Sequence, residues 1–336
     1  MPFISDFAGP QYPVPSWPPR EPGSLRRTST IDTHAADSGE VDVDLRARDV
    51  RTAPAGAVEV GAECELRSHL SNRVIQRISA TPDDRRLDRL SACLVGPGFR
   101  NVVADVLADE AGRATLLHLL LDDWPGASLV SGYAAQHALI TRGAELPVGD
   151  GVADRMTGIC SGFAPTSSVV SFVSRNNLMP NAPGPAAPDL IRSDPDGIHP
   201  VDPLPPHSMR RLRRLDLHPR RGESVDFDAH FRDSHVDGAS VETVVHEYTV
   251  NGTVELAGRT ITELTAAVHV LPWQECPGAL GSAARVRGMA LAELRPRIRT
   301  EFVGTSTCTH LNDTLRSLGD LDALIDLQDR DDLAAL

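Results

Sequence analysis

Apolar and polar residues alternate along two stretches of the chain, at about residues 25–135 and 206–330, and helix-like spacing follows the alternation in each stretch. Alternation with β-branched residues is typical of strands. The second stretch predicts strands at Val225–Phe231, Thr243–Leu256 and Thr260–Leu271. It then predicts helices at Pro277–Met289, Leu291–Ile298 and Thr309–Ile325, with Pro296 expected to kink or end the second helix.

The first stretch has the same order, with strands before helices. Its strands are predicted at Val58–Leu66 and Val74–Ala80, and its helices near Asp88–Leu94 and Phe99–Leu107. A sheet with one apolar face must bury that face against other elements. The pattern therefore predicts an α+β fold in which each stretch is an antiparallel β-meander covered by helices on one side.

The two stretches are also similar residue by residue. RRTSTIDTHAADSGEVDVDLRARD begins at Arg26 and RRLRRLDLHPRRGESVDFDAHFRD begins at Arg210, a constant offset of 184 (210 - 26). Identical pairs in this alignment include Arg27 and Arg211, Asp32 and Asp216, and Asp49 and Asp233. GRATLLHLLLDD from Gly112 matches GTSTCTHLNDTL from Gly304 at an offset of 192. Self-similarity of this kind predicts two tandem copies of one unit in a pseudo-symmetric arrangement.

Proline-rich segments separate and precede the copies. We expect a proline-rich leader at 1–24, a degenerate first repeat at 25–135, a connecting segment and proline-rich linker at 136–205, and a second repeat at 206–330 that carries the site. The connecting segment contains GICSGF and SSVVSFV, so it is expected to have some structure of its own.

The charge balance argues against nucleic acid as a partner. The 336 residues have a formal net charge of -13, and every strong base is an arginine. A net acidic surface repels phosphate unless a basic stripe offsets it. The one basic cluster, Arg210, Arg211, Arg213 and Arg214, is expected to form a solvated strand face.

The sequence also predicts no membrane segment and a cytoplasmic location. No apolar run reaches the roughly 18 residues of a membrane span, and the opening segment lacks the order of a signal peptide. Five cysteines are an odd number in a long chain, which favours reduced thiols over a disulfide framework.

Thiol and imidazole groups are concentrated in the second copy, at the predicted ends of its elements. We predict a zinc or iron site held by Cys276, Cys308, His310 and His246. Cys308 has Leu116 at the matching place in the first copy, whereas His310 has His118. The starts of the helices are expected to lower the pKa of both thiols. The alternative interpretation is that these cysteines are small buried hydrophobic residues.

Four further residues are candidate proton-transfer groups, His230, Asp233, His235 and Asp313. Strand alternation places His230 on one face and Asp233 with His235 on the other. Asp313 lies one turn after His310 and could accept a hydrogen bond from that imidazole, or simply face water. Cys160 has no histidine at a diagnostic spacing, so its role stays open.

Two resemblances follow from these residues. The H-E-Y of one strand, the cysteine after the next strand and the G-x-S-x-C-T-H-L that opens the last helix resemble a bacterial domain-of-unknown-function family, over about Met209 to Leu321. The same positions are similar to those of the iron-sulfur cluster assembly scaffolds, which place a meander before helices. That likeness implies a scaffold-like fold with a metal pocket, although here histidine replaces the first cysteine ligand and the final pair is C-x-H.

The leading hypothesis is a metal-dependent enzyme of hydrolase or lyase type that acts on a small-molecule substrate. The first copy would pair with the second inside the chain, as two subunits of a dimer would, and a homodimer is also allowed. Two alternatives stay open. One is an iron or iron-sulfur cluster scaffold without turnover, and the other is a metal-free enzyme with Cys276 or Cys308 as its nucleophile.

Overall fold

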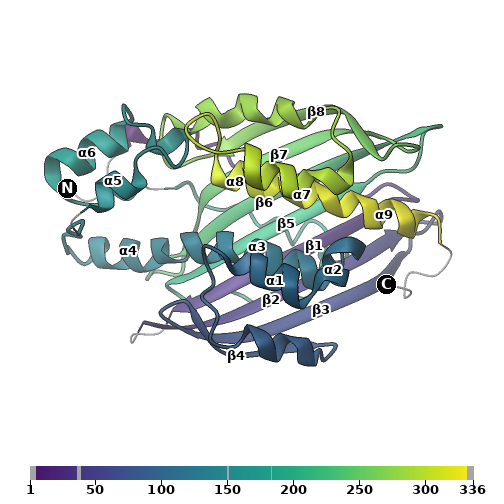
Figure 1. Cartoon of the computed structure of the whole chain (residues 1–336), viewed down its shortest axis with the longest axis horizontal. Helices are drawn as coiled ribbons and strands as arrows, with labels where there is room; N and C mark the ends of the chain where they lie inside the picture. The colour runs from purple at the N-terminus through teal and green to yellow at the C-terminus, as the bar shows by residue number, and fades with distance from the viewer. Residues whose placement is uncertain (1–4, 36–38, 150, 183, 331–336) are drawn as a thin grey trace.

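A computed structural model describes residues 5–35, 39–149, 151–182 and 184–330. In this part of the chain, eight strands form one antiparallel sheet in the order β4-β3-β2-β1-β5-β6-β7-β8 (Figure 1). The strands are β1 (Leu25–Ala35), β2 (Glu40–Thr52), β3 (Val58–Ser71), β4 (Val74–Thr81), β5 (Ser208–Leu217), β6 (Ser224–Val236), β7 (Glu242–Glu255) and β8 (Thr260–Val270). Two four-strand meanders are thus joined through their first strands.

The helices of both halves cover the same face of the sheet (Figure 1). The α-helices are α1 (Phe99–Val106), α2 (Ala108–Arg113), α3 (Leu116–Val130), α4 (Gly132–Thr141), α5 (Val152–Met156), α6 (Ser168–Asn176), α7 (Leu291–Glu301), α8 (Thr309–Ser317) and α9 (Leu321–Gln328). The 3-10 helices are η1 (Ser5–Phe7), η2 (Arg85–Leu90), η3 (Ser161–Phe163), η4 (Pro195–Gly197), η5 (Cys276–Val286) and η6 (Leu318–Asp320). Helix α3 contacts β1–β3 and α8 contacts β6 and β7.

The α+β class predicted from the alternation is confirmed, and the predicted strands are all present. Strands β3, β4 and β6 are longer than predicted, whereas β7 and β8 match their predicted bounds to within one residue. The structure adds β2 in the first half, and it adds one strand at the start of the repeated segment in each half, β1 and β5. These two strands pair with each other in antiparallel register, with Leu25 opposite Leu217 and His34 opposite Ser208. The central pair turns two meanders into a single sheet.

Apolar side chains form one main core under the helices of each half. In the first half, Leu45 and Leu66 pack with Phe99 and Trp124. In the second half the core is larger and includes Phe227, Val250, Leu294 and Leu315, all of them buried. Burial of these faces is the main driving force that holds the helices on the sheet.

The C-terminal helix differs from its prediction. Thr309–Ile325 was expected to be one amphipathic helix, but it divides into α8, η6 and α9. The tight turn at η6 directs the Asp320 carboxylate toward Arg295 at 2.6 Å and Arg27 at 3.5 Å. Pro296 does not end the preceding helix, because α7 continues to Glu301. Packing and ion pairs of the last helices thus decide their bounds more than the local pattern does.

The expectation of a solvated basic strand face is wrong. The β5 arginines are all buried, and they alternate between the two faces of the sheet. Arg211 and Arg213 lie on the helix face, where their guanidinium groups bind Asp123 of α3. On the other face, Arg214 pairs with Asp216 and Asp228. Each buried charge therefore has a carboxylate partner, as burial of an ion requires.

Two buried ion pairs connect β1 with β5 on the face away from the helices. Arg26 donates to both oxygens of Asp216 at 2.6 and 2.7 Å. Arg210 donates to both oxygens of Asp32, each at 2.7 Å. These are bidentate arginine–carboxylate pairs, the geometry that best compensates a charge removed from water. They join the two halves of the sheet.

The leader and the proline-rich linker cover this second face. Trp17 is buried and packs with Leu190, Ile198 and Leu212. In the linker, Asp194 binds Arg20 at 2.7 Å and Arg26 at 2.6 Å. Both segments are proline-rich and mostly irregular, as predicted, but they form part of the packed structure instead of free spacers.

The cross-strand pairs generate a stability prediction. Asp32→Ala leaves the buried Arg210 charge without its carboxylate, so the free energy of unfolding should fall by about 3–5 kcal/mol. Chemical denaturation measures the change. The matched control is Asp202→Ala, which removes an ion pair of Arg46 whose carboxylate is 76% exposed. That variant should lose less than about 1 kcal/mol. Equal losses in the two variants would contradict the proposed importance of the central pair.

A second prediction concerns the linker residue His199, which is buried and contacts the hydroxyl groups of Thr28 and Thr30. Burial, together with the nearby arginines, lowers the pKa of His199 from 6.5 to about 3. Below pH 6.5 the unfolded chain binds a proton that the folded chain does not, so stability falls as the pH drops toward 3. His199→Gln should reduce the slope by up to about 1.4 kcal/mol per pH unit in this window. Denaturation between pH 7 and pH 4 tests it, and an unchanged slope would be the contrary result.

Candidate metal centre

Three candidate residues from separate parts of the second half meet on the helix face of the sheet. Asp233 of β6 and His246 of β7 are direct cross-strand partners. The register of this strand pair shifts immediately after Asp233, so the pair lies beside a β-bulge. Bulges reorient side chains and are frequent next to active sites. His310, in the first turn of α8, approaches the pair from the helix layer.

One potential ligand atom from each residue lies within 4.8 Å of the other two. The Asp233 Oδ2 atom is 3.4 Å from His246 Nδ1 and 3.9 Å from His310 Nε2. Both of these nitrogens are buried and have no hydrogen-bond partner. In the described part of the chain, no other set of three histidine, cysteine or acidic side chains is arranged closely enough to hold a metal ion.

The charge state of the three groups suits a cation. Burial acts to raise the pKa of Asp233, but the charge of Arg211 outweighs it and holds the pKa well below its usual value. Burial and the neighbouring His246 lower the pKa of His310 well below its usual value. At neutral pH the site therefore offers an ionised carboxylate and a neutral imidazole, the forms that ligate metals. The two imidazole rings stack with centroids 3.6 Å apart.

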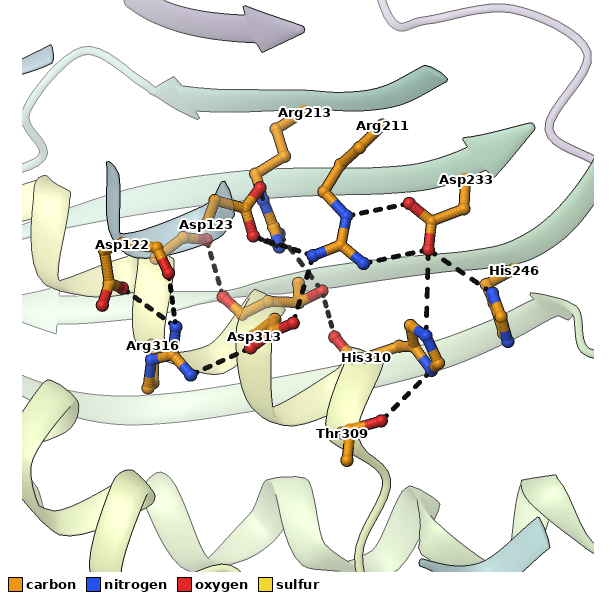
Figure 2. Close-up of polar contacts among 12 residues, drawn as sticks. Asp122, Asp123, Arg211, Arg213, Asp233, His246, Thr309, His310, Asp313 and Arg316 are labelled. Atoms are coloured by element: carbon orange, nitrogen blue, oxygen red, sulfur yellow. Dashed lines mark hydrogen bonds and ion pairs between the residues drawn. The ribbon is translucent and has the colours of Figure 1, made fainter. Parts of the chain in front are cut away.

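Arg211 holds the carboxylate in place. Its guanidinium donates to Asp233 Oδ1 at 2.8 Å and Oδ2 at 3.0 Å (Figure 2). The remaining nitrogen, Nη1, donates to Asp123 at 3.0 Å and to Asp313 at 3.1 Å. Asp313 belongs to α8, so the same arginine positions the helix that carries His310. Hydrogen bonds of this kind fix the orientation of the Asp233 carboxylate.

The close approach of α3 to this network requires glycine at position 126. A Cβ atom at Gly126 would lie 2.2 Å from Asp313 Oδ2 and 2.3 Å from Arg211 Nη1. The backbone of α3 thus lies directly against the ion pairs, and Asp123 from the same helix completes them. The first half of the chain supplies part of the support for a site in the second half.

Cys308 lies beside this site, with its Sγ atom 3.8 Å from His310 Nδ1. The hydroxyl group of Tyr248 donates to the same sulfur at 3.4 Å. Burial raises the pKa of Cys308, although the Tyr248 hydrogen bond and the backbone N–H groups of α8 oppose it. The expectation of a thiol acidified by the helix start is therefore wrong for Cys308.

Cys276 lies in the apolar core with Cys308, and the structure does not bring it together with His246. Burial, followed by the effects of Cys308 and Cys160, raises the pKa of Cys276 well above its usual value, again opposite to the expectation. The GICSGF loop packs against this thiol, because a Cβ atom at Gly162 would lie 2.6 Å from its sulfur. The two predicted cysteine ligands therefore lie outside the group of three side chains that could hold a metal ion.

The remaining predicted residues lie apart from this site. His230 is on the opposite face of the sheet, where Trp17 donates to its Nδ1 atom at 3.2 Å and its Nε2 atom lies 2.7 Å from Glu247. His235 is on the helix face, as alternation predicted, but its ring packs against Tyr133 and His137 of α4. Asp313 binds Arg211 and Arg316 instead of the imidazole of His310.

Arg211, Asp123 and Cys160 belong to the surroundings of the site although the sequence did not assign them to it. Arg211 and Asp233 recur at the offset of 184 as Arg27 and Asp49, and that pair also forms a bidentate ion pair, at 2.8 Å. The shared identities were a signal of an ion pair, because both members recur together. No recurring pair identifies Asp123, because it lies in the first half of the chain and contacts Arg211 only in the folded protein.

Comparison with known proteins supports the family resemblance of the second half. Residues 209–323 match a family described as a protein of unknown function, DUF2889. The match begins in β5 and ends in α9, so it includes all three residues of the site. The chain matches none of the curated proteins and none of the solved structures with which it was compared. Among the described residues, no helix is both long enough and apolar enough to cross a membrane.

Thiol reactivity checks the description of the cysteines. Cys93 is partly exposed, whereas the other four cysteines are buried. Reactivity follows thiolate content and access. Brief iodoacetamide treatment at pH 7.5 should label Cys93 and leave Cys276 and Cys308 unlabelled until the protein is unfolded. Peptide mass spectrometry measures the labelling, and a Cys93→Ser variant should show almost none. Rapid labelling of Cys308 in the folded protein would contradict this prediction.

Proposed function

We propose that the second half carries a catalytic metal centre held by Asp233, His246 and His310, and that the protein is a metal-dependent enzyme of hydrolase or lyase type. The observation that carries this proposal is the convergence of one carboxylate and two imidazoles within 4.8 Å, with two buried nitrogens that lack a hydrogen-bond partner. A buried polar atom without a partner is costly, so its presence calls for an explanation such as an ion.

The ligand set indicates zinc or iron. Two imidazole nitrogens and one carboxylate oxygen suit borderline divalent cations, and they are the ligand types of both catalytic zinc and non-haem iron sites. Three protein ligands leave coordination positions open for water or substrate. This set keeps His246 and His310 of the sequence prediction and replaces the two cysteines by Asp233.

A metal at this position would polarise a carbonyl group or lower the pKa of a bound water. Arg211 would keep Asp233 ionised and oriented, and Tyr248 with Cys308 would form the wall next to His310. We propose a small molecule as the substrate, since Asp233 and His246 are buried and His310 is partly buried. The cytoplasm is the proposed location, supported by five unpaired cysteines.

We also infer that the two halves derive from one duplicated unit and pair within the chain with approximate two-fold symmetry. The β1–β5 register supports this, because Arg26 lies opposite Asp216 and Asp32 lies opposite Arg210. At the offset of 184, Arg26 is equivalent to Arg210 and Asp32 is equivalent to Asp216, so the two ion pairs are equivalent to each other. The β2–β3 pair also has its register shift next to Asp49, the counterpart of Asp233.

The same alignment indicates that only the second half keeps the site. At the offset of 184 the counterpart of His246 is Ala62, and at the offset of 192 the counterpart of His310 is His118. The first half thus retains the arginine–aspartate pair and lacks one imidazole. Its proposed role is to complete the sheet and to supply Asp123 to Arg211.

A metal-free cysteine enzyme is the second candidate. Cys308 Sγ, His310 and Asp233 follow one another at 3.8 and 3.9 Å, the order of a nucleophile, a base and an orienting carboxylate. Burial raises the pKa of the Cys308 thiol, and Cys308 is therefore a weaker nucleophile than this role requires. The cluster-scaffold hypothesis has less support, since among the described residues the cysteines are not part of a group that could hold a metal.

Metal analysis tests the proposal. Protein purified without chelator, or reconstituted with Zn²⁺ or Fe²⁺, should bind about one equivalent of metal per chain, because the three ligands form one site. The metal affinity should fall by roughly 10²-fold or more in His246→Ala and in Asp233→Asn. Loss of a residue that only supports a metal ligand costs about 10–100-fold, and loss of the ligand itself should cost at least as much. Elemental analysis after desalting and competition with a chromogenic chelator measure both quantities.

Cys276→Ser is the matched control, since Cys276 lies outside the three-residue group. It should keep the metal content and affinity of the parent protein. Absence of metal from the parent after reconstitution, or loss of metal in Cys276→Ser but not in His246→Ala, would reject the proposed ligand set. Circular dichroism of each variant separates loss of a ligand from loss of fold.

A further inference from the structure

A cavity lies between the helices of the two halves. The cavity has a volume of about 380 Å³ and is lined by residues of α1, α3, α7 and α8 together with the Gly96–Gly98 loop and Arg73. Neither His246 nor His310 lines it, so it is distinct from the proposed metal centre. Cavities of this size accommodate small organic ligands.

The walls of this cavity are strongly basic in a chain that is otherwise acidic. Four arginines line the cavity, Arg73, Arg100, Arg299 and Arg316, against the single carboxylate of Asp313. Arg100 and Arg316 share Asp313 and the nearby Asp122. The cavity therefore has an excess of positive charge, although the formal net charge of the chain is -13.

Two of the four arginines have no acidic partner. Arg73 donates only to the hydroxyl group of Ser128 at 3.0 Å and to the carbonyl group of Val95 at 2.8 Å. Arg299 donates to the side-chain oxygen of Asn101. Among the described residues, no carboxylate lies within ion-pair distance of either guanidinium. Arg73 is half-buried, and a cation in that position normally has such a partner, which a ligand would supply, whereas Arg299 is exposed and free to turn toward a ligand.

The position of Arg73 in the backbone is also unusual. Asn72 and Arg73 form the turn between β3 and β4, with φ angles of 50° and 66°. Such a turn favours glycine at its second central position, and an arginine there has a conformational cost. Its guanidinium nevertheless reaches back over the loop that opens α1, where a Cβ atom at Gly96 would lie 3.1 Å from its Nη2 atom. The turn thus directs the guanidinium group of Arg73 toward the cavity.

Much of the remaining cavity wall is apolar, formed by Pro97, Pro125, Leu129, Ile298 and Phe302, with the polar side chains of Thr309 and Asn312 beside them. Leu129 is 58% exposed, a large apolar side chain with no cover on its outer side. A few charged groups set in an apolar wall are typical of small-ligand sites. The wall would accept a hydrocarbon or aromatic portion of a ligand beside its charged group.

We propose that this cavity binds a small organic anion, a phosphate monoester or a carboxylic acid, with an apolar portion. Its oxyanion contacts Arg73 and Arg299, and its apolar portion lies on Leu129, Ile298 and Phe302. The first half supplies Arg73 and the second half supplies Arg299, so the ligand bridges the two halves and stabilises their association through binding linkage.

Isothermal titration calorimetry with three probes tests this site. Phenyl phosphate should bind at least about tenfold more tightly than inorganic phosphate, and phenol should bind more weakly than both, since it lacks the doubly charged group. Binding of phenyl phosphate should weaken when the salt concentration is raised. Equal affinity of phenyl phosphate and phenol would reject the role of the arginines.

Two variants and one control complete the test. Arg299→Gln and Arg73→Gln should each weaken phenyl phosphate binding by about tenfold, the usual effect of a lost charged hydrogen bond. Arg299 is exposed, so its variant should fold normally. Arg297→Gln is the matched control, because Arg297 lies on the same helix, pairs with Glu293 and Glu301 and does not line the cavity. Equal weakening by Arg297→Gln and Arg299→Gln would show nonspecific attraction and overturn the proposal. Loss of metal at the Asp233 centre leaves this result unchanged.

Discussion

The structure depends on the pairing of arginines buried in its two central strands. A guanidinium removed from water is tolerated only when carboxylates compensate its charge and its donors. In β1 and β5 these carboxylates come from both halves of the chain: Asp216 for Arg26, Asp32 for Arg210, and Asp123 for Arg211 and Arg213. The apolar cores give each half its driving force, whereas the ion pairs specify how the halves meet.

The proposed metal centre is a consequence of this arrangement. Arg211 lies at the centre of the ion pairs, so the carboxylate of Asp233 is held on one side and the helix with His310 is held on the other through Asp313. A site assembled in this way is rigid before any ligand arrives, which is what a defined coordination geometry requires. The cost is that a substitution in the network affects the fold and the site together.

Of the eight strands in the described residues, the sequence predicted five, and it predicted few of the contacts between elements. Alternation identified β6, β7 and β8 because one face of each strand is apolar, and the repeated residues marked both halves. The β5 arginines looked like a solvated face, because a polar residue gives the same pattern whether water or a carboxylate lies opposite. Asp233 was identified as a candidate, but its place beside His246 follows from cross-strand register, which a local pattern does not contain. The loop that carries Cys160 packs against Cys276 through Gly162, a contact that no spacing rule describes.

The pairing of β1 with β5 has a consequence for biosynthesis. Leu25 lies opposite Leu217, so almost 200 residues of chain must leave the ribosome before the first strand can acquire this neighbour. Until then the nascent first half presents an unprotected strand edge with unpaired amides and uncompensated guanidinium groups. Domains usually fold one after another during translation. This sheet is completed only when most of the polypeptide has emerged.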